Sequence, residues 1–192
     1  WAGLYRGMAH FFAAEYRVAL RCFEAVHPLI SAVPAYIYLM DFHFYSALSL
    51  SHQPEAADSN ALRGHLDKFA DWADLNPALF ADKYALLRAE CARLDGNTGE
   101  ALQQYERAIR LSRQAGYLHI HALANQLAGR CYKALQLDIA ADAYIKAATG
   151  SWENWGAQAM VRQLEQRYPH LSAPLQNSAL APIPFTPDAA CY

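Results

Sequence analysis

Two similar stretches of sequence decide the fold of this chain. Residues 96–109 read GNTGEALQQYERAI, and residues 137–148 read LDIAADAYIKAA. Each stretch carries an alanine, an aromatic residue four positions later and another alanine three positions after that. The aligned pairs, each 39 positions apart, are Ala101/Ala140, Tyr105/Tyr144 and Ala108/Ala147. A third copy near the start consists of Tyr16, Ala19, Leu20, Phe23 and Val26. This spacing is typical of the second helix in a helix-turn-helix repeat, where alanine lets neighbouring helices approach and the aromatic ring fills the space between them.

The composition indicates an ordered globular domain. Of the 192 residues, 54% are apolar and 18% are charged, and a chain of this length can bury roughly 70% of its unfolded surface. The net charge is −2 and the isoelectric point is about 6.5, with no stripe of basic residues. We therefore expect no nucleic-acid partner, because binding to phosphate backbones needs clustered Lys and Arg.

The cysteines and the hydropathy pattern favour a cytoplasmic chain. Cys22, Cys91, Cys131 and Cys191 contain no CxxC pair, and the first three lie in apolar helical patterns. We expect buried thiols in a reducing compartment rather than zinc ligands or disulfides. No run of 18 apolar residues predicts a membrane span. The chain begins Trp-Ala-Gly, with neither an initiator Met nor a signal peptide, and is interpreted as an excerpt from a longer protein.

The apolar periodicity predicts about nine helices and no strand. A fourth helix is capped by Asp58 or Ser59, and a fifth begins with Asn76 as N-cap, Pro77 in the first turn and Gly96 beyond its end. The predicted helices cover about residues 1–13, 15–30, 35–49, 60–73, 77–95, 98–115, 118–134, 137–148 and 154–168.

These elements predict an all-α fold, a right-handed α-α superhelix of four helical hairpins plus a closing helix. The solenoid covers residues 1–171. Residues 172–192 carry Pro174, Pro182, Pro184 and Pro187 among Ala, Ser and Asn, which predicts a linker or an extended tail.

The sequence carries no motif for catalysis, and we expect no catalytic residue, no cofactor and no metal in this segment. The P-loop, GxGxxG, HExxH and GxSxG patterns are all missing from it. His119 and His121 would point about 200° apart around a helix, so we interpret them as surface residues at a helix start. His43 is interpreted as a hydrogen-bonded core histidine, and the remaining histidines form no cluster by spacing.

Other conspicuous residues have structural interpretations. The spacing predicts exposed helix ion pairs between Glu106 and Arg110 and between Glu90 and Arg93. The aromatic residues of the second half are predicted to pack in the core, although they could also form a ligand box; they are Tyr84, Tyr105, Tyr132, Tyr144, Trp152, Trp155 and Tyr168.

A concave groove is the candidate binding surface, because the first helix of each hairpin lines the inside of such a solenoid. The register predicts groove-facing residues at Lys83, Glu90, Arg93, Asn125 and Lys133. This mixed-charge set could hold a peptide or a neighbouring domain of the same chain, and a solvated groove is the alternative. The set lacks the dense Lys, Arg and Asn cluster that grips a C-terminal carboxylate.

Several longer motifs carry a resemblance to a known family. They are FYSALSL at 44–50, LxxFAxWA at 66–73, NPALFADKY at 76–84, AExAR at 89–93, ALANQLA at 122–128, WGAQA at 155–159 and LExxYP at 164–169. Together they resemble the helical region between the ATPase and GAF modules of very large bacterial and fungal signalling kinases, over residues 16–171. The last two motifs are the most specific. Gln126 departs from the family pattern, which has Glu there, and the residues after Leu171 do not resemble the start of a GAF domain.

The resemblance implies a tetratricopeptide-like, non-catalytic region of a multidomain signal-transduction kinase that mediates contacts within the chain or between copies. None of the ATP-binding or phosphotransfer residues of the family lies in this region. Two alternatives stay open. One is a free-standing adaptor that grips a short peptide in its groove, and the other is the effector-binding region of an ATPase-type transcription activator.

Overall fold

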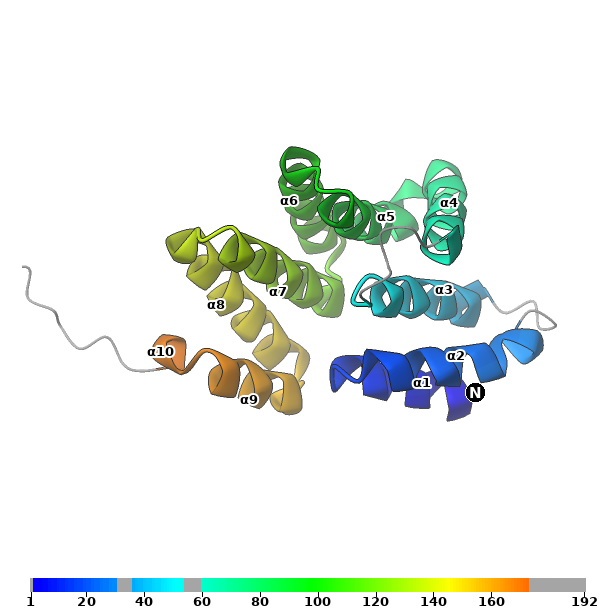
Figure 1. Ribbon diagram of the computed structural model, residues 1–192, viewed down its shortest axis with the longest axis horizontal. Coiled ribbons are helices and arrows are strands. Elements are labelled where there is room, and N and C mark those ends of the chain that lie inside the picture. The colour runs from blue at the N-terminus through cyan, green and yellow to red at the C-terminus, as the bar shows by residue number, and fades with distance from the viewer. Residues whose placement is uncertain (1, 31–35, 54–59, 173–192) are drawn as a thin grey trace, which may run out of the picture.

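The computed structural model describes residues 2–30, 36–53 and 60–172, and this part of the chain is all-α (Figure 1). Its helices pack as consecutive antiparallel hairpins, so the predicted helical repeat array is confirmed. The helices are α1 (Ala2–Phe12), α2 (Tyr16–Ile30), α3 (Tyr36–Leu50), α4 (Asn60–Leu75), α5 (Pro77–Leu94), α6 (Thr98–Ala115), α7 (Leu118–Ala134), α8 (Asp138–Trp155), α9 (Gln158–Arg167) and α10 (Pro169–Ser172). Pro34, the predicted caps Asp58 and Ser59, Cys191 and the predicted tail from 173 onward lie outside the described residues.

The last two predicted helices have the wrong boundaries. α8 continues through Gly150 to Trp155 instead of ending near Ala148. The hydroxyl of Thr149 donates to the carbonyl of Ile145 at 2.9 Å, so this polar residue is accommodated within the helix. Fully buried Trp152 anchors the added turns. The helix ends where Gly156 takes a φ of 83°, a left-handed conformation that costs glycine little.

The structural repeat has a period of 40 residues, one more than the sequence alignment indicates. Left-handed residues stand two positions before α6 and α8, at Gly96 and Gln136, and directly after them, at Gly116 and Gly156. The buried pairs that this period aligns are Ala101/Ala141, Tyr105/Ile145 and Ala108/Ala148. The 39-residue alignment is therefore off by one residue. α8 carries the small–large–small pattern twice, once starting at Ala140 and once starting at Ala141, and the alignment uses the first of these.

A glycine at the contact between α7 and α8 explains which register faces inward. A Cβ atom on Gly129 would lie 2.7 Å from Cδ1 of Ile145 and 3.2 Å from the carbonyl oxygen of Ala141. The two helices thus approach as closely as a missing side chain allows. Tyr144, which the alignment pairs with Tyr105, instead lies beside Tyr132 with ring centroids 4.8 Å apart.

The aromatic and cysteine predictions are confirmed in part. Tyr105 and Trp152 are fully buried, whereas Trp155 is 48% exposed and belongs to the surface. Cys91 and Cys131 are buried free thiols, and Cys22 is a free thiol that is half-buried.

The two ends of the array touch. The rings of Phe12 in α1 and Trp152 in α8 meet edge to face at 5.8 Å. Arg130 of α7 donates to the hydroxyl of Tyr16 in α2 at 3.3 Å. Figure 1 shows the α1–α2 hairpin lying next to α9 at the bottom of the molecule. Side chains of the first hairpin therefore occupy part of the inner surface that a longer, open solenoid would leave free.

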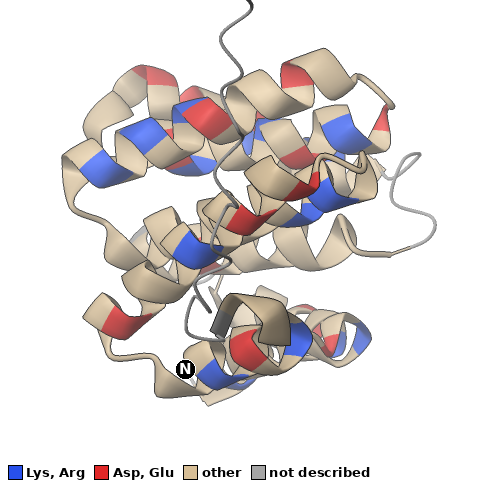
Figure 2. Ribbon diagram, turned by 90° about the vertical axis from the view of Figure 1, so that its left-hand side faces the viewer, with Lys and Arg blue, Asp and Glu red and all other residues tan. Residues whose placement is uncertain are grey.

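Charges of both signs are mixed along the helices. Figure 2 shows Lys and Arg alternating with Asp and Glu, with no stripe of one sign on the side that it displays. No helix in the described part of the chain is long and apolar enough to cross a bilayer.

Candidate functional site

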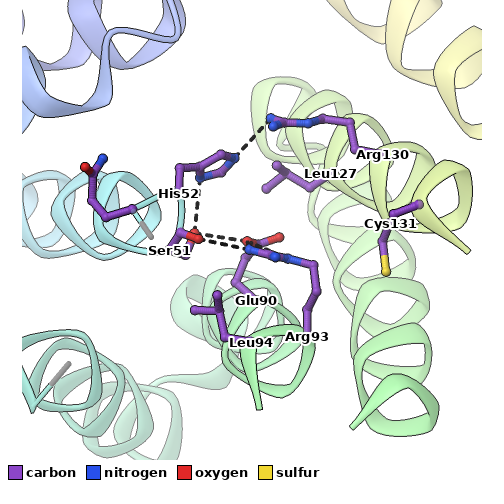
Figure 3. A pocket seen from close by; sticks show the side chains of 10 residues that line it. Ser51, His52, Glu90, Arg93, Leu94, Leu127, Arg130 and Cys131 are labelled. Carbon is purple, nitrogen blue, oxygen red and sulfur yellow. Dashed lines mark hydrogen bonds and ion pairs between the residues drawn. The ribbon is translucent and has the colours of Figure 1, made fainter. Parts of the chain in front are cut away.

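A pocket of about 430 Å³, lined by both polar and apolar side chains, opens between the end of α3, the C-terminal part of α5 and the C-terminal part of α7 (Figure 3). We call it the α3–α5–α7 pocket. It is lined by Ser51, His52, Gln53, Glu90, Arg93, Leu94, Leu127, Arg130, Cys131 and Ala134.

Glu90 forms the floor of the pocket. Its side chain is only 2% exposed. The carboxylate accepts hydrogen bonds from Arg93 Nη2 at 2.7 Å, from Ser51 Oγ at 3.0 Å and from the hydroxyl of Tyr105. Burial alone would raise the pKa of Glu90, but the charge of Arg93 and the hydrogen bonds from Arg93 and Tyr105 outweigh it, so the pKa lies below its ordinary value. Glu90 is therefore an ionised, fully bonded group.

The predicted Glu90–Arg93 ion pair is present but is not an exposed surface pair. Arg93 Nη2 also donates to the backbone carbonyl of Ser51 at 3.0 Å. Carbonyls at the C-terminal end of a helix lack partners within the helix and attract positive charge. Arg93 therefore joins the end of α3 to α5, which is a structural role. The other predicted pair, Glu106–Arg110, is not found among the described residues, where Glu106 accepts a hydrogen bond from the Tyr144 hydroxyl.

His52 and Arg130 form the opposite wall. His52 Nδ1 lies 2.8 Å from the carbonyl oxygen of Leu48, which can only accept, so Nδ1 carries the proton. His52 Nε2 then accepts from Arg130 Nη1 at 3.0 Å. Burial and the charges of Arg130 and Arg93 lower the pKa of His52 by more than the Glu90 carboxylate and the hydrogen bond to Leu48 raise it, so the ring is neutral near pH 7. The ring of Tyr16 stacks on His52 with centroids 4.1 Å apart.

The pocket has one positive charge in excess. Arg93 compensates Glu90, and His52 is neutral. Among the described residues, Arg130 contacts the hydroxyl of Tyr16 and the imidazole of His52 but no carboxylate. An arginine has five N–H donors in a planar fork, and only Nη1 is engaged in these contacts. The arrangement can therefore receive an anionic group at Arg130.

The structure brings two of the five predicted groove residues, Glu90 and Arg93, into this pocket. Lys83 is buried elsewhere, 3.3 Å from Asp82 and over the ring of Tyr117. Asn125 is also buried, and its amide donates to the carbonyl of His121 at 2.8 Å. Lys133 is exposed outside the pocket and pairs with Asp138 at 2.7 Å.

Sequence reasoning missed His52 and Arg130. The 40-residue period would have identified Arg130, because it aligns this residue with Glu90 on the preceding hairpin. The 39-residue alignment pairs Arg130 with Cys91 instead. No sequence signal identifies His52, which lies beyond the end of α3 and reaches Arg130 through the curvature of the array.

A second group of polar side chains lies in the first half of the array. His43, predicted as a hydrogen-bonded core histidine, is buried with its Nδ1 2.7 Å from Nδ1 of His65, so this prediction is confirmed. His27 stacks on Phe42 beside them, although no spacing indicates a cluster. In the part of the chain that the structure describes, no group of three or more His, Cys, Asp or Glu is arranged to hold a metal ion.

The two histidines at the start of α7 are half-buried rather than fully on the surface. His119 stacks on Trp155 with centroids 5.3 Å apart, and His121 Nδ1 lies 2.9 Å from Ser151 Oγ. Both side chains therefore pack α7 against α8.

Comparison with known proteins identifies no family. No protein-family model matches the chain, and a search of the curated proteins finds no significant match. Function must therefore be inferred from the repeat array and its pocket.

Proposed function

We propose that this chain is a non-catalytic helical-repeat region that mediates contacts with other protein domains, in the manner of the multidomain signalling kinases that its sequence resembles. The observation that carries the proposal is the α3–α5–α7 pocket, a cavity with an excess positive charge set in an array of hairpins. Such arrays present extended surfaces to partners.

The chemistry of the pocket supports binding rather than catalysis. Burial raises the pKa of Cys131, so its thiol stays protonated and weakly nucleophilic. The lone pair of His52 Nε2 faces the guanidinium of Arg130, so it is not offered to a substrate proton. The carboxylate of Glu90 is held by three neighbouring side chains. His52 and Glu90 are thus committed to structural contacts, and the thiol of Cys131 stays protonated.

An exposed apolar turn next to the pocket supports a protein partner. Ala134 lines the pocket, and the turn between α7 and α8 follows it directly. Leu135 is 38%, Leu137 47% and Ile139 91% exposed to solvent. Apolar side chains grouped in this way are typical of surfaces that contact another protein. We therefore place the domain contact at the α7–α8 turn.

The direct test is binding to the domains that the resemblance predicts on either side. Any ATPase or GAF module that the gene encodes next to this segment is produced as a separate protein and titrated against this chain. We expect at least one to bind, and Ile139→Ser to weaken binding roughly fivefold or more, since interface residues of this kind contribute about 1 kcal/mol. Leu75→Ser is the matched control, because Leu75 is also strongly exposed but lies at the end of α4. Absence of binding to both modules at any concentration would refute the coupling role.

A second candidate, the free-standing peptide-binding adaptor, is favoured by the excess charge of the pocket. Charge reversal at Arg93 does not test it, because Arg93 holds α3 to α5 and its loss would disturb the fold. Arg130 is the informative position, since its described contacts are with neutral groups. Capture of a peptide by the isolated chain, without either flanking module, would favour the adaptor.

A further inference from the structure

We propose that the α3–α5–α7 pocket binds the carboxylate of a glutamate or aspartate side chain presented by a protein partner, with Arg130 as the anchoring cation. The protein origin of this carboxylate rests on the proposed function. The carboxylate chemistry rests on the pocket alone.

The geometry of Arg130 favours a carboxylate as the ligand. Its Nη1 donates to Tyr16 and His52, at 3.3 Å and 3.0 Å, and the remaining donors of the fork have no partner among the described residues. A guanidinium makes paired, parallel hydrogen bonds to a carboxylate, which are shorter and stronger than bonds between neutral groups. Figure 3 shows Arg130 reaching toward the pocket from α7, opposite Arg93 on α5.

The net charge of the pocket lining also favours a carboxylate. The described lining contains two arginines and one carboxylate, with His52 neutral, so a single positive charge is uncompensated. A carboxylate brings one negative charge and neutralises it. A phosphate dianion would bring more negative charge than this and would face the ionised Glu90 below. The balance therefore selects a monoanion.

The side chain of Arg130 is already held in place by its neighbours. The hydrogen bond from His52 Nδ1 to the Leu48 carbonyl fixes the tautomer that accepts from Arg130. The stack of Tyr16 on His52 fixes the plane of the ring. Groups held in their binding conformation lose less entropy when a ligand arrives, which favours binding.

The size and walls of the pocket suit a side chain. Its volume of about 430 Å³ lies within the range of small-ligand sites. Leu94, Leu127 and Ala134 supply apolar wall against which the methylene groups of a glutamyl side chain can pack. Ala134 also leads into the exposed α7–α8 turn, so a partner seated on that turn lies beside the pocket mouth.

The test uses N-acetyl-glutamate amide, a neutral-backbone mimic of a glutamyl residue, and its uncharged isostere N-acetyl-glutamine amide. Both are titrated into the unaltered chain while the amide and arginine Nε–H signals are followed by NMR. We expect the glutamate probe to shift the signals of Arg130, Leu127 and Ala134 with a Kd in the millimolar range. The glutamine probe should bind at least roughly tenfold more weakly. Equal effects of the two probes would overturn the proposal.

Variants then assign the anchor. Arg130→Gln is expected to lose the preference for the glutamate probe, whereas Arg130→Lys keeps part of it because the charge remains and the fork is lost. Arg107→Gln is the matched control, since Arg107 is exposed on α6 and outside the pocket. Thermal melting shows whether each variant is folded. Should Arg130→Gln unfold, the comparison of the two probes on the unaltered chain still decides the question.

Three further outcomes test the inference and separate it from the proposed function. Binding of acetate or inorganic phosphate as tightly as the glutamate probe would show a general anion site and refute the side-chain assignment. Capture of the flanking modules by a chain that ignores the glutamate probe would overturn the inference alone. A chain that binds the probe but neither module would overturn the proposed coupling role alone.

Discussion

The two halves of the array both bring helices together at glycines, since a Cβ atom on Gly7 would lie 2.4 Å from the ring of Phe23 and one on Gly129 would lie 2.7 Å from Ile145. They differ in the aromatic rings that pack around these contacts. In α1–α4, large rings interlock: Phe11 meets Tyr45 at 5.2 Å, and Phe44 meets Phe69 at 5.9 Å. In α5–α8, small residues such as Ala101 and Gly129 let the helices approach, and large side chains fill the remaining spaces. Where the halves meet, the buried Glu90–Arg93 pair and Ser51 join α3 to α5.

Left-handed residues repeat at a spacing of 40 residues around α6 and α8, in the second half. A contact made through a missing side chain allows a single register, because a shift by one residue replaces glycine or alanine with a larger group. Rings can meet at many angles, so the first half does not need to repeat a sequence pattern. Buried polar groups also differ along the array: neutral histidines lie among the rings, the Glu90–Arg93 pair lies at the junction, and a second buried pair, Asp82–Lys83, lies within α5.

The largest effect should come from breaking the junction with Arg93→Met. This change removes the charge that compensates Glu90 and leaves a buried carboxylate unpaired, which costs about 3–5 kcal/mol of unfolding free energy. Urea denaturation followed by circular dichroism measures the loss. Arg88→Met is the control, because its partner Glu100 is part-exposed and such pairs contribute at most about 1 kcal/mol. Similar losses for the two variants would show that the junction pair is no more important than a surface pair.

The second effect tests the neutral histidines of the first half. Burial lowers the pKa of His43 to about 3 and that of His65 to about 4, from an ordinary value of 6.5. The unfolded chain therefore binds more protons below pH 6.5, so stability is complete above that pH and is lost as the pH falls toward 4. We expect a loss of about 2–3 kcal/mol between pH 7 and pH 5 from the pair.

Denaturation curves at several pH values check this, and the double variant His43→Leu, His65→Leu should show a flatter profile between pH 7 and pH 5. Glu90 at the junction contributes to stability over a different pH range. The pKa of Glu90 is lowered below its ordinary 4.5, so its contribution to stability is lost only at more acidic pH. A profile that is unchanged in the double variant would mean that the histidine pair is solvated.

The sequence was sufficient for the fold because helix ends and apolar periodicity are local signals. Asn97 caps α6 by accepting from the Glu100 amide, and Gly116 ends it in a left-handed conformation. Asn76 precedes α5 at Pro77, although its side chain makes no capping bond. The end of α8 was missed because Gly150 and Thr149 weaken helix propensity, and the tertiary anchoring of Trp152 overrides that preference.

The candidate site was predictable only in part. Spacing identified Glu90 and Arg93 as neighbours on one helix, but it could not show that Glu90 is buried, because burial depends on Ser51 after the end of α3 and on Tyr105 of α6. Arg130 meets His52 and Tyr16 across 78 and 114 positions of sequence. Contacts of that range depend on how the two ends of the array close, which no local pattern specifies.

The third prediction concerns the close contact in the second half. Gly129→Ala places a methyl group 2.7 Å from Ile145 and 3.2 Å from the backbone of α8, so α7 and α8 must move apart. Overpacking of this kind costs about 1–3 kcal/mol, measured by urea denaturation. The double variant Gly129→Ala, Ile145→Val removes the nearest methyl group and should recover part of the loss. An unchanged stability for Gly129→Ala alone would refute the close-packing explanation of the 40-residue register.

The smallest expected effect is a gain in stability, and it comes from replacing Gly150 with alanine. This glycine lies inside α8, and a Cβ atom added there would meet nothing within 4 Å. Alanine restricts the unfolded chain and favours the helix, so Gly150→Ala should stabilise the protein by about 0.5–1 kcal/mol. Both glycines lie inside helices, and they differ in whether a neighbouring helix covers them. If Gly129→Ala lowers the free energy of unfolding and Gly150→Ala raises it, the loss at Gly129 is due to the contact between α7 and α8. Destabilisation by both changes would instead mean that α8 is held by features other than its approach to α7.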